Sequence, residues 1–73
     1  MVFNIVNDKA MGSRLKNLRQ EKGLTQKEVS ESLSLRLSTY QKYEEGVRRP
    51  SDSVKVQLAD FFEVSVQYLF FEI

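Results

Sequence analysis

The 73-residue chain contains no cysteine and no histidine, and its only proline is Pro50. Without cysteine no disulfide can form, and without either residue type the usual ligands of a structural zinc ion are missing. The same absence removes the commonest general base and the most nucleophilic side chain of enzymes. The sequence has no glycine-rich phosphate loop either. We therefore expect a protein that is not an enzyme and that uses no metal, cofactor or small-molecule ligand.

Long apolar runs are also missing from the sequence. No stretch approaches the roughly 20 apolar residues that a membrane-spanning helix needs. Residues 1–8 lack the basic start and the apolar core of a secretion signal. A chain of this length forms one small domain with a limited core, and a dimer is a common source of added stability at this size. We expect a soluble intracellular protein with no membrane partner.

The net charge is only +1, but the charges are unevenly distributed along the chain. Residues 1–49 carry ten lysines and arginines against six acidic residues, whereas residues 50–73 carry one lysine against four acidic residues. A basic N-terminal part and an acidic C-terminal part suit a protein that places one face on a polyanion such as DNA. Two ordinary solvated surfaces explain the same balance equally well.

Apolar residues recur at helical spacing and predict an all-α domain of five helices. The expected helices cover about residues 8–22, 26–33, 36–45, 52–62 and 66–70. Several residues mark the ends of these helices. They are Thr25 with Glu28 in a capping-box pattern, Ser51 and Ser65 as further N-caps, and Gly23 and Gly46 as C-terminal stops. The residues expected to face the core are Met11, Leu15, Leu18, Val29, Leu33, Tyr40, Tyr43, Leu58, Ala59 and Phe62, with either Val54 or Val56.

The two ends of the chain are rich in residues that favour β-strands. Residues 2–6 and 69–73 are predicted to pair as a short antiparallel ribbon, although a simple tail at the N-terminus fits the sequence as well. This gives three parts: an N-terminal arm or strand at 1–7, a helical domain at 8–70, and a C-terminal tail or strand at 71–73.

Two stretches of sequence carry a family resemblance. Residues 18–26 read Leu-Arg-Gln-Glu-Lys-Gly-Leu-Thr-Gln, and residues 43–51 read Tyr-Glu-Glu-Gly-Val-Arg-Arg-Pro-Ser. Between them, apolar residues fall where two short helices that cross at a steep angle must touch. Together with residues 58–69, this pattern resembles the Cro/C1 (XRE-like) helix-turn-helix regulators of the phage-repressor type. Ser30 and Ser34 depart slightly from it, since the family usually has alanine and glycine there.

The resemblance implies a sequence-specific DNA-binding transcriptional regulator, which we expect to be a repressor. Residues 8–70 would form the DNA-binding domain, and a recognition helix at about 36–45 would enter the major groove of a palindromic operator. The expected partners are double-stranded DNA and a second copy of the chain, because one short helix reads few base pairs. The expected location is the cytoplasm of a bacterium, at the nucleoid, with the gene carried by the bacterium or by a phage.

Candidate DNA contacts follow from the side of the third helix that faces away from its two tyrosines. The residues expected near base edges are Arg36, Leu37, Ser38, Gln41 and Lys42. Plain exposure to solvent is the simpler explanation for each of them. The candidate phosphate contacts are Gln26, Lys27, Arg48 and Arg49, of which Gln26 is implied by the resemblance. Lys27 is a weaker candidate than the other three, as is Arg14.

Three further groups of residues carry expectations. The family resemblance implies a structural ion pair between Arg19 and Glu44, which would link the first and third helices. Glu45 departs from the family, which often has asparagine there, and its carboxylate would lie near phosphates. The candidates for a dimer interface are the apolar residues towards the C-terminus, unless the N-terminal segment covers them: Phe61, Tyr68, Phe70, Phe71 and Ile73.

A protein-interaction module on the same fold is the competing prediction, for example an antitoxin-like or co-regulator domain. Fold alone does not fix function. The near-neutral charge, Glu45 and the apolar Leu37 on the recognition helix all favour this alternative. A salt-sensitive DNA-binding face distinguishes the two predictions, because an interaction module needs a partner protein instead.

Overall fold

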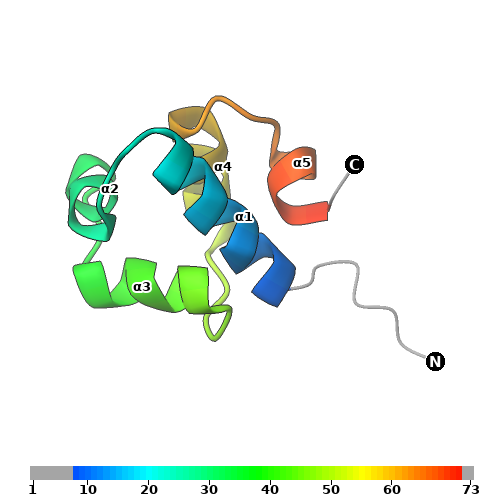
Figure 1. Cartoon of the computed structure of the whole chain (residues 1–73). Coiled ribbons are helices and arrows are strands. Elements are labelled where there is room, and N and C mark those ends of the chain that lie inside the picture. The colour runs from blue at the N-terminus through cyan, green and yellow to red at the C-terminus, as the bar shows by residue number, and fades with distance from the viewer. Residues whose placement is uncertain (1–7, 72–73) are drawn as a thin grey trace.

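The computed structural model describes the backbone of residues 8–71 and the side chains of residues 9–70. Within this range the chain forms five helices and no strand, so the predicted all-α class is confirmed (Figure 1). The helices are α1 (Asp8–Glu21), α2 (Gln26–Ser32), α3 (Leu37–Glu45), α4 (Asp52–Phe61) and α5 (Val66–Phe71). In the same range, none of the helices is long and apolar enough to cross a membrane.

Helix α1 lies between α3 and α5 and contacts both of them (Figure 1). Helix α2 packs on α3 at a steep angle, and α4, which lies behind α1 in this view, contacts α5. Within residues 8–71, this arrangement leaves the outer side of α3 free of other helices. The third helix is therefore presented on the surface by the two that precede it.

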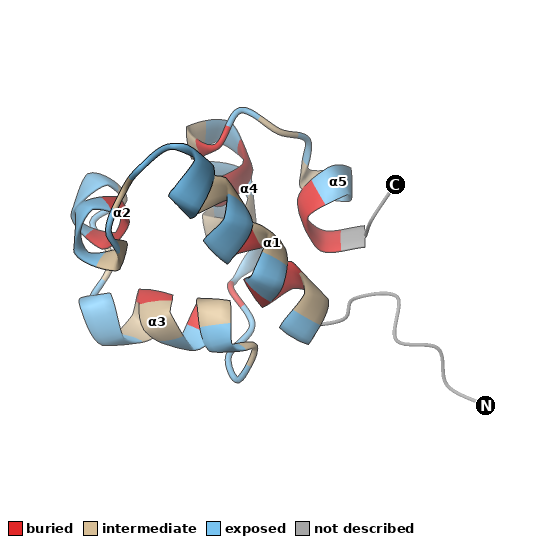
Figure 2. Ribbon diagram, in the orientation of Figure 1, coloured by how far each residue is buried: buried red, intermediate tan, exposed pale blue. Residues whose placement is uncertain are grey.

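The core runs along the inner sides of all five helices (Figure 2). Its buried members are Met11, Leu15, Val29, Tyr40, Tyr43, Leu58, Ala59, Phe62, Leu69 and Phe70. Every core position predicted from helical spacing is either buried or packed against this cluster. The choice between two valines is also settled, because Val54 packs against the core while Val56 is 58% exposed.

Side-chain caps define where most of the helices begin. The Thr25 hydroxyl accepts a hydrogen bond from the backbone N–H of Glu28 at 3.0 Å, and the Glu28 carboxylate accepts one from the Thr25 N–H at 2.8 Å. The predicted capping box is therefore confirmed. The hydroxyl of Ser51 caps α4, and that of Ser65 accepts from the N–H of Tyr68 at 2.9 Å in α5.

The first four helices all end in the same kind of turn. Just after each helix one residue takes a left-handed conformation, namely Gly23, Ser34, Gly46 and Glu63, with φ of 70°, 56°, 77° and 59°. The N–H of the next, apolar residue then donates to a carbonyl five residues earlier, at 2.8 to 3.1 Å. This is the Schellman motif. Glycine adopts the conformation freely, whereas serine and glutamate adopt it with strain.

The predicted ribbon between the two ends is wrong on its C-terminal side. Residues 69–71 belong to α5, which extends one residue beyond the predicted boundary at residue 70. Leu69 and Phe70 are both fully buried, and with Val66 they follow the i, i+3, i+4 spacing of a helix. Packing against the core has therefore overridden their preference for strands. The other residues of the ribbon, 2–6 and 72–73, lie outside the described residues.

Candidate nucleic-acid interface

Helix α3 presents one polar side to solvent and one aromatic side to the core. Tyr40 and Tyr43 are buried, and Ser38, Lys42 and Glu45 are exposed on the opposite side. These three recur at i, i+4 and i+7, so they form one stripe along the helix. The stripe offers a hydroxyl, an ammonium and a carboxylate on a helix that can enter a major groove.

The beginning of α3 carries two more of the predicted base contacts. Arg36 is the N-cap and is exposed, so the helix itself starts at Leu37, one residue later than predicted. The Arg36 side chain makes no capping hydrogen bond to any described residue. The Leu37 side chain is 39% exposed although it is apolar. Both residues are accessible at the end of α3 that follows the turn from α2.

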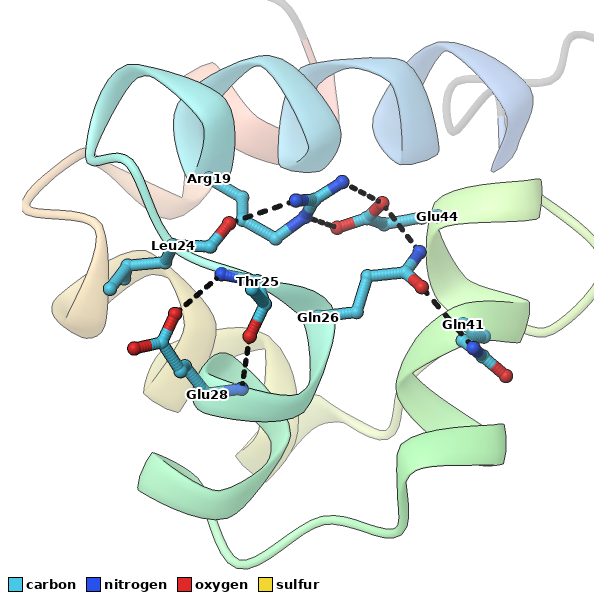
Figure 3. Close-up of polar contacts among 7 residues, drawn as sticks. All are labelled: Arg19, Leu24, Thr25, Gln26, Glu28, Gln41 and Glu44. Atoms are coloured by element: carbon cyan, nitrogen blue, oxygen red, sulfur yellow. Dashed lines mark hydrogen bonds and ion pairs between the residues drawn. The ribbon is translucent and has the colours of Figure 1, made fainter.

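The predicted ion pair between α1 and α3 is present and shielded from solvent. Nε of Arg19 lies 2.7 Å from Oε2 of Glu44, and Nη2 donates to Oε1 at 3.2 Å (Figure 3). The side chains are only 12% and 3% exposed. Nη1 of Arg19 also donates to the carbonyl of Leu24 at 2.9 Å, which ties the turn before α2 to the same guanidinium. The pair thus links α1, α3 and the turn that leads into α2.

Gln26 and Gln41 extend this pair towards the surface. Nε2 of Gln26 donates to Oε1 of Glu44 at 3.0 Å, and Oε1 of Gln26 accepts from Nε2 of Gln41 at 3.2 Å (Figure 3). Both amides are half-buried. Sequence reasoning assigned Gln26 to a phosphate and Gln41 to a base edge, and it missed their contact with each other. No local pattern indicates this contact, since the two residues belong to different helices.

The charges at this centre are stabilised by their hydrogen bonds. Burial raises the pKa of the Glu44 carboxyl, but the groups around it, above all the hydrogen bond from Arg19, outweigh this effect, so the pKa lies below its usual value of 4.5. The hydrogen bond to Glu44 also raises the pKa of the Arg19 guanidinium. Burial and the nearby carboxylate raise the pKa of Tyr40. The carboxylate therefore stays ionised at neutral pH and acts only as an acceptor.

Gly12 sets the distance between α1 and α3, and sequence reasoning missed this role. A Cβ atom at this position would lie 2.3 Å from the backbone oxygen of Glu44 and 2.7 Å from that of Tyr43. Only a residue without a side chain allows such a close approach. A glycine inside a helical pattern is a recognisable signal of close packing, and it was available in the sequence.

The candidate phosphate contacts differ in their surroundings. Lys27, Arg48 and Arg49 are exposed, while Gln26 is engaged as described above. Arg14 instead donates from Nε to the carbonyl of Leu69 at 2.8 Å, and thus links α1 to α5. Its role is therefore at least partly structural.

The predicted dimer residues do not share one environment. Phe70 is fully buried within its own chain, so its assignment to a dimer interface is wrong. The Nζ atom of Lys55 lies over the Phe70 ring, 5.5 Å from its centroid. Phe61 packs edge-on against Phe62, with its ring centroid 5.0 Å away, and Tyr68 is 46% exposed. The side chains of Phe71 and Ile73 lie outside the described residues.

Known proteins share both the sequence pattern and the fold. Over 60 residues the chain is 37% identical to the HTH-type transcriptional regulator ImmR of Bacillus subtilis (strain 168), an alignment that covers 82% of this chain and 47% of ImmR. The chain thus spans about half the length of that relative.

Two solved structures have a similar fold, the DNA-binding domain of BldD and the S. venezulae BldD DNA-binding domain. Each has a TM-score of 0.75 and 30% identity over 88% of this chain, covering 93% and 96% of the respective structures. The helix-turn-helix family itself matches residues 15–69, which is most of the chain. The expected membership is confirmed, and this chain belongs to the helix-turn-helix family.

Proposed function

We propose that this protein is a transcriptional regulator that binds a palindromic operator as a homodimer and represses transcription. The observation that carries the proposal is the outer side of α3, where Ser38 and Lys42 are exposed and which none of the other described helices covers. The ImmR relative is a transcriptional regulator by name, and the two similar structures are DNA-binding domains. A bacterial cytoplasm, where operator DNA lies, is the corresponding location.

In the proposed complex, α3 lies in the major groove with its polar stripe towards the bases. Ser38 and Lys42 occupy the centre of the contact, and Lys42 donates to acceptors on base edges such as those of guanine. Arg36 and Leu37 lie at the leading end of the helix, where Leu37 suits a thymine methyl group. The buried ion pair behind α3 supports this role because it fixes the angle at which the helix is presented.

Contacts to phosphates would supply most of the affinity. Three exposed cations precede or follow the recognition helix in the sequence. Lys27 lies at the start of α2, and Arg48 and Arg49 lie in the loop after α3. Such contacts fix the register of the protein on the duplex and carry no sequence information.

A homodimer would double the number of base pairs that are read. Two recognition helices related by a two-fold axis match half-sites about 34 Å apart. Tyr68 of α5 is 46% exposed and Phe61 of α4 is half-buried, and the two helices contact each other. This apolar surface suits a small dimer interface.

A protein-interaction module remains the second candidate function, because two observations favour it. Glu45 places a carboxylate in the outward stripe of α3, where it would face phosphates. Leu37 adds exposed apolar surface at the start of the same helix. A surface of this mixed character also suits a protein partner.

The test is a titration of the pure protein against a library of genomic DNA fragments at two salt concentrations. A regulator retains fragments that share a palindromic site, and its affinity falls steeply as salt rises. Lys42→Ala and Ser38→Ala should weaken this retention, while Gln57→Ala, an exposed change on α4, should leave it unchanged. Weak and unselective retention by the wild-type protein at both salts would instead support the interaction module.

A further inference from the structure

A row of polar groups leads from the interior of the domain to the surface of α3. It starts at Arg19, which holds both oxygens of Glu44. It continues through Gln26, whose amide lies between Oε1 of Glu44 at 3.0 Å and Nε2 of Gln41 at 3.2 Å. Figure 3 shows the four side chains in this order, with the amide oxygen of Gln41 pointing away from the others.

The direction of each amide in this row follows from the one before it. An ionised carboxylate can only accept hydrogen bonds, so Gln26 must turn its NH₂ group towards Glu44. Its carbonyl oxygen then faces the other way and can only accept, so Gln41 must turn its own NH₂ group inwards. The carboxylate at the centre thus determines which way round the surface amide is held.

The outer edge of Gln41 therefore has a defined composition. One N–H is committed to Gln26, which leaves the carbonyl oxygen and the second N–H without a partner among the hydrogen bonds described for it. The residue lies one turn after Ser38 and directly before Lys42, beside the outward stripe of α3. A donor and an acceptor are thus presented together at the edge of the surface that would meet DNA.

We propose that Gln41 reads an adenine in the operator and that Gln26 is the positioning residue that orients it. Adenine offers an N6 donor and an N7 acceptor in the major groove, and these match the free carbonyl oxygen and the free N–H of Gln41. The inference rests on the proposed DNA-binding function and deepens it by naming one base and the device that selects it. It also replaces the phosphate contact first assigned to Gln26.

The experiment is a selection of the full 73-residue protein on randomised DNA duplexes, followed by sequencing of the bound fraction. The wild-type protein should prefer adenine at one position of each half-site. Gln41→Ala should abolish that single preference, which corresponds to a loss of about 5- to 150-fold at a bidentate contact. Gln41→Glu should move the preference towards cytosine, whose N4 donates to a carboxylate.

Gln26→Ala separates a positioning role from a phosphate contact. If Gln26 orients Gln41, the adenine preference weakens while the preferences at all other positions and the affinity for unrelated DNA stay the same. If it binds phosphate instead, affinity falls uniformly for every sequence, and the proposal is overturned. Gln57→Ala makes the same chemical change at an exposed site on α4 and should alter neither quantity.

Two further results would overturn the proposal in distinguishable ways. A wild-type protein that selects a site whose base preferences are all unchanged by Gln41→Ala refutes the adenine contact and leaves the regulator function intact. A wild-type protein that selects no sequence refutes both.

An NMR measurement on the free protein tests the orienting contact without DNA. The side-chain NH₂ signals of Gln41 should shift on Gln26→Ala and stay in place on Gln57→Ala. Signals that do not move on Gln26→Ala refute the orienting contact.

Discussion

The closest approach between α1 and α3 gives the sharpest prediction, because it depends on one missing atom. Replacing Gly12 by alanine would put a Cβ atom 2.3 Å from the backbone oxygen of Glu44 and 2.8 Å from its carbonyl carbon. These neighbours are backbone atoms, so no side-chain rotation can relieve the contact. The two helices must move apart by roughly 1 Å, since well-packed carbon atoms lie about 3.5 Å or more from their neighbours.

The expected loss of stability is the balance of two opposing effects. Overpacking a close contact costs about 1–3 kcal/mol, and a backbone clash belongs at the upper end of that range. Replacing glycine by alanine in a helix stabilises the folded state by about 1 kcal/mol, because alanine has the higher helix propensity. The net loss for Gly12→Ala is therefore about 2 kcal/mol, against a total stability on the order of 4–11 kcal/mol for a domain of this size. The melting temperature should fall by about 8–16 °C.

Urea denaturation followed by circular dichroism at 222 nm measures this loss directly. Two variants serve as controls. Ser13→Ala, at an exposed position in the same helix, should be neutral or slightly stabilising. Gly23→Ala meets no described atom within 4 Å, so its cost should come from the left-handed backbone alone. If Gly12→Ala proved as stable as the wild type, α1 and α3 would not be packed as described.

Three further predictions concern the turns, the ion pair and the start of α3. Ser34→Gly and Glu63→Gly should each stabilise the protein by about 0.5–1 kcal/mol in urea denaturation, because the relief of left-handed strain exceeds the added entropy of the unfolded chain. No change in either variant would contradict the strain. Since the pKa of Glu44 is lowered by folding, its contribution to stability is complete above about pH 4.5 and is lost as the pH falls below that value. Glu44→Gln should therefore be less stable than the wild type at pH 7, and it should lose less stability than the wild type on acidification. If both proteins lost the same stability on acidification, Glu44 would not be the source of the acid sensitivity. Arg36→Ser should add about 1 kcal/mol through a new N-cap while weakening DNA binding in a fluorescence titration, and an unchanged affinity would remove this residue from the DNA contact.

The sequence predicts those features that depend on neighbours along the chain. Thr25 with Glu28, Ser51 and the glycines at helix ends were all placed correctly, because caps and turns are formed by residues three to five apart. The ion pair between α1 and α3 was also predicted, but only through the family resemblance. Local chemistry alone would not have paired two residues 25 positions apart.

The features that the sequence did not predict depend on contacts between helices. Residues 69–70 fitted both the predicted helix and the predicted ribbon, and it is the burial of Leu69 and Phe70 that makes them helical. The same burial removes Phe70 from the predicted dimer surface. The contact of Gln26 with Gln41 depends on the angle between α2 and α3, which no periodicity gives.

The shielding of the Arg19–Glu44 pair has a practical consequence for handling the protein. Mobile ions screen charges in water but act weakly on a pair whose side chains are only 12% and 3% exposed. Concentrated salt should thus strip bound nucleic acid from exposed cations such as Lys42 without loosening the link between α1 and α3. The protein can then be washed free of nucleic acid in its folded state and returned to low salt without a refolding step.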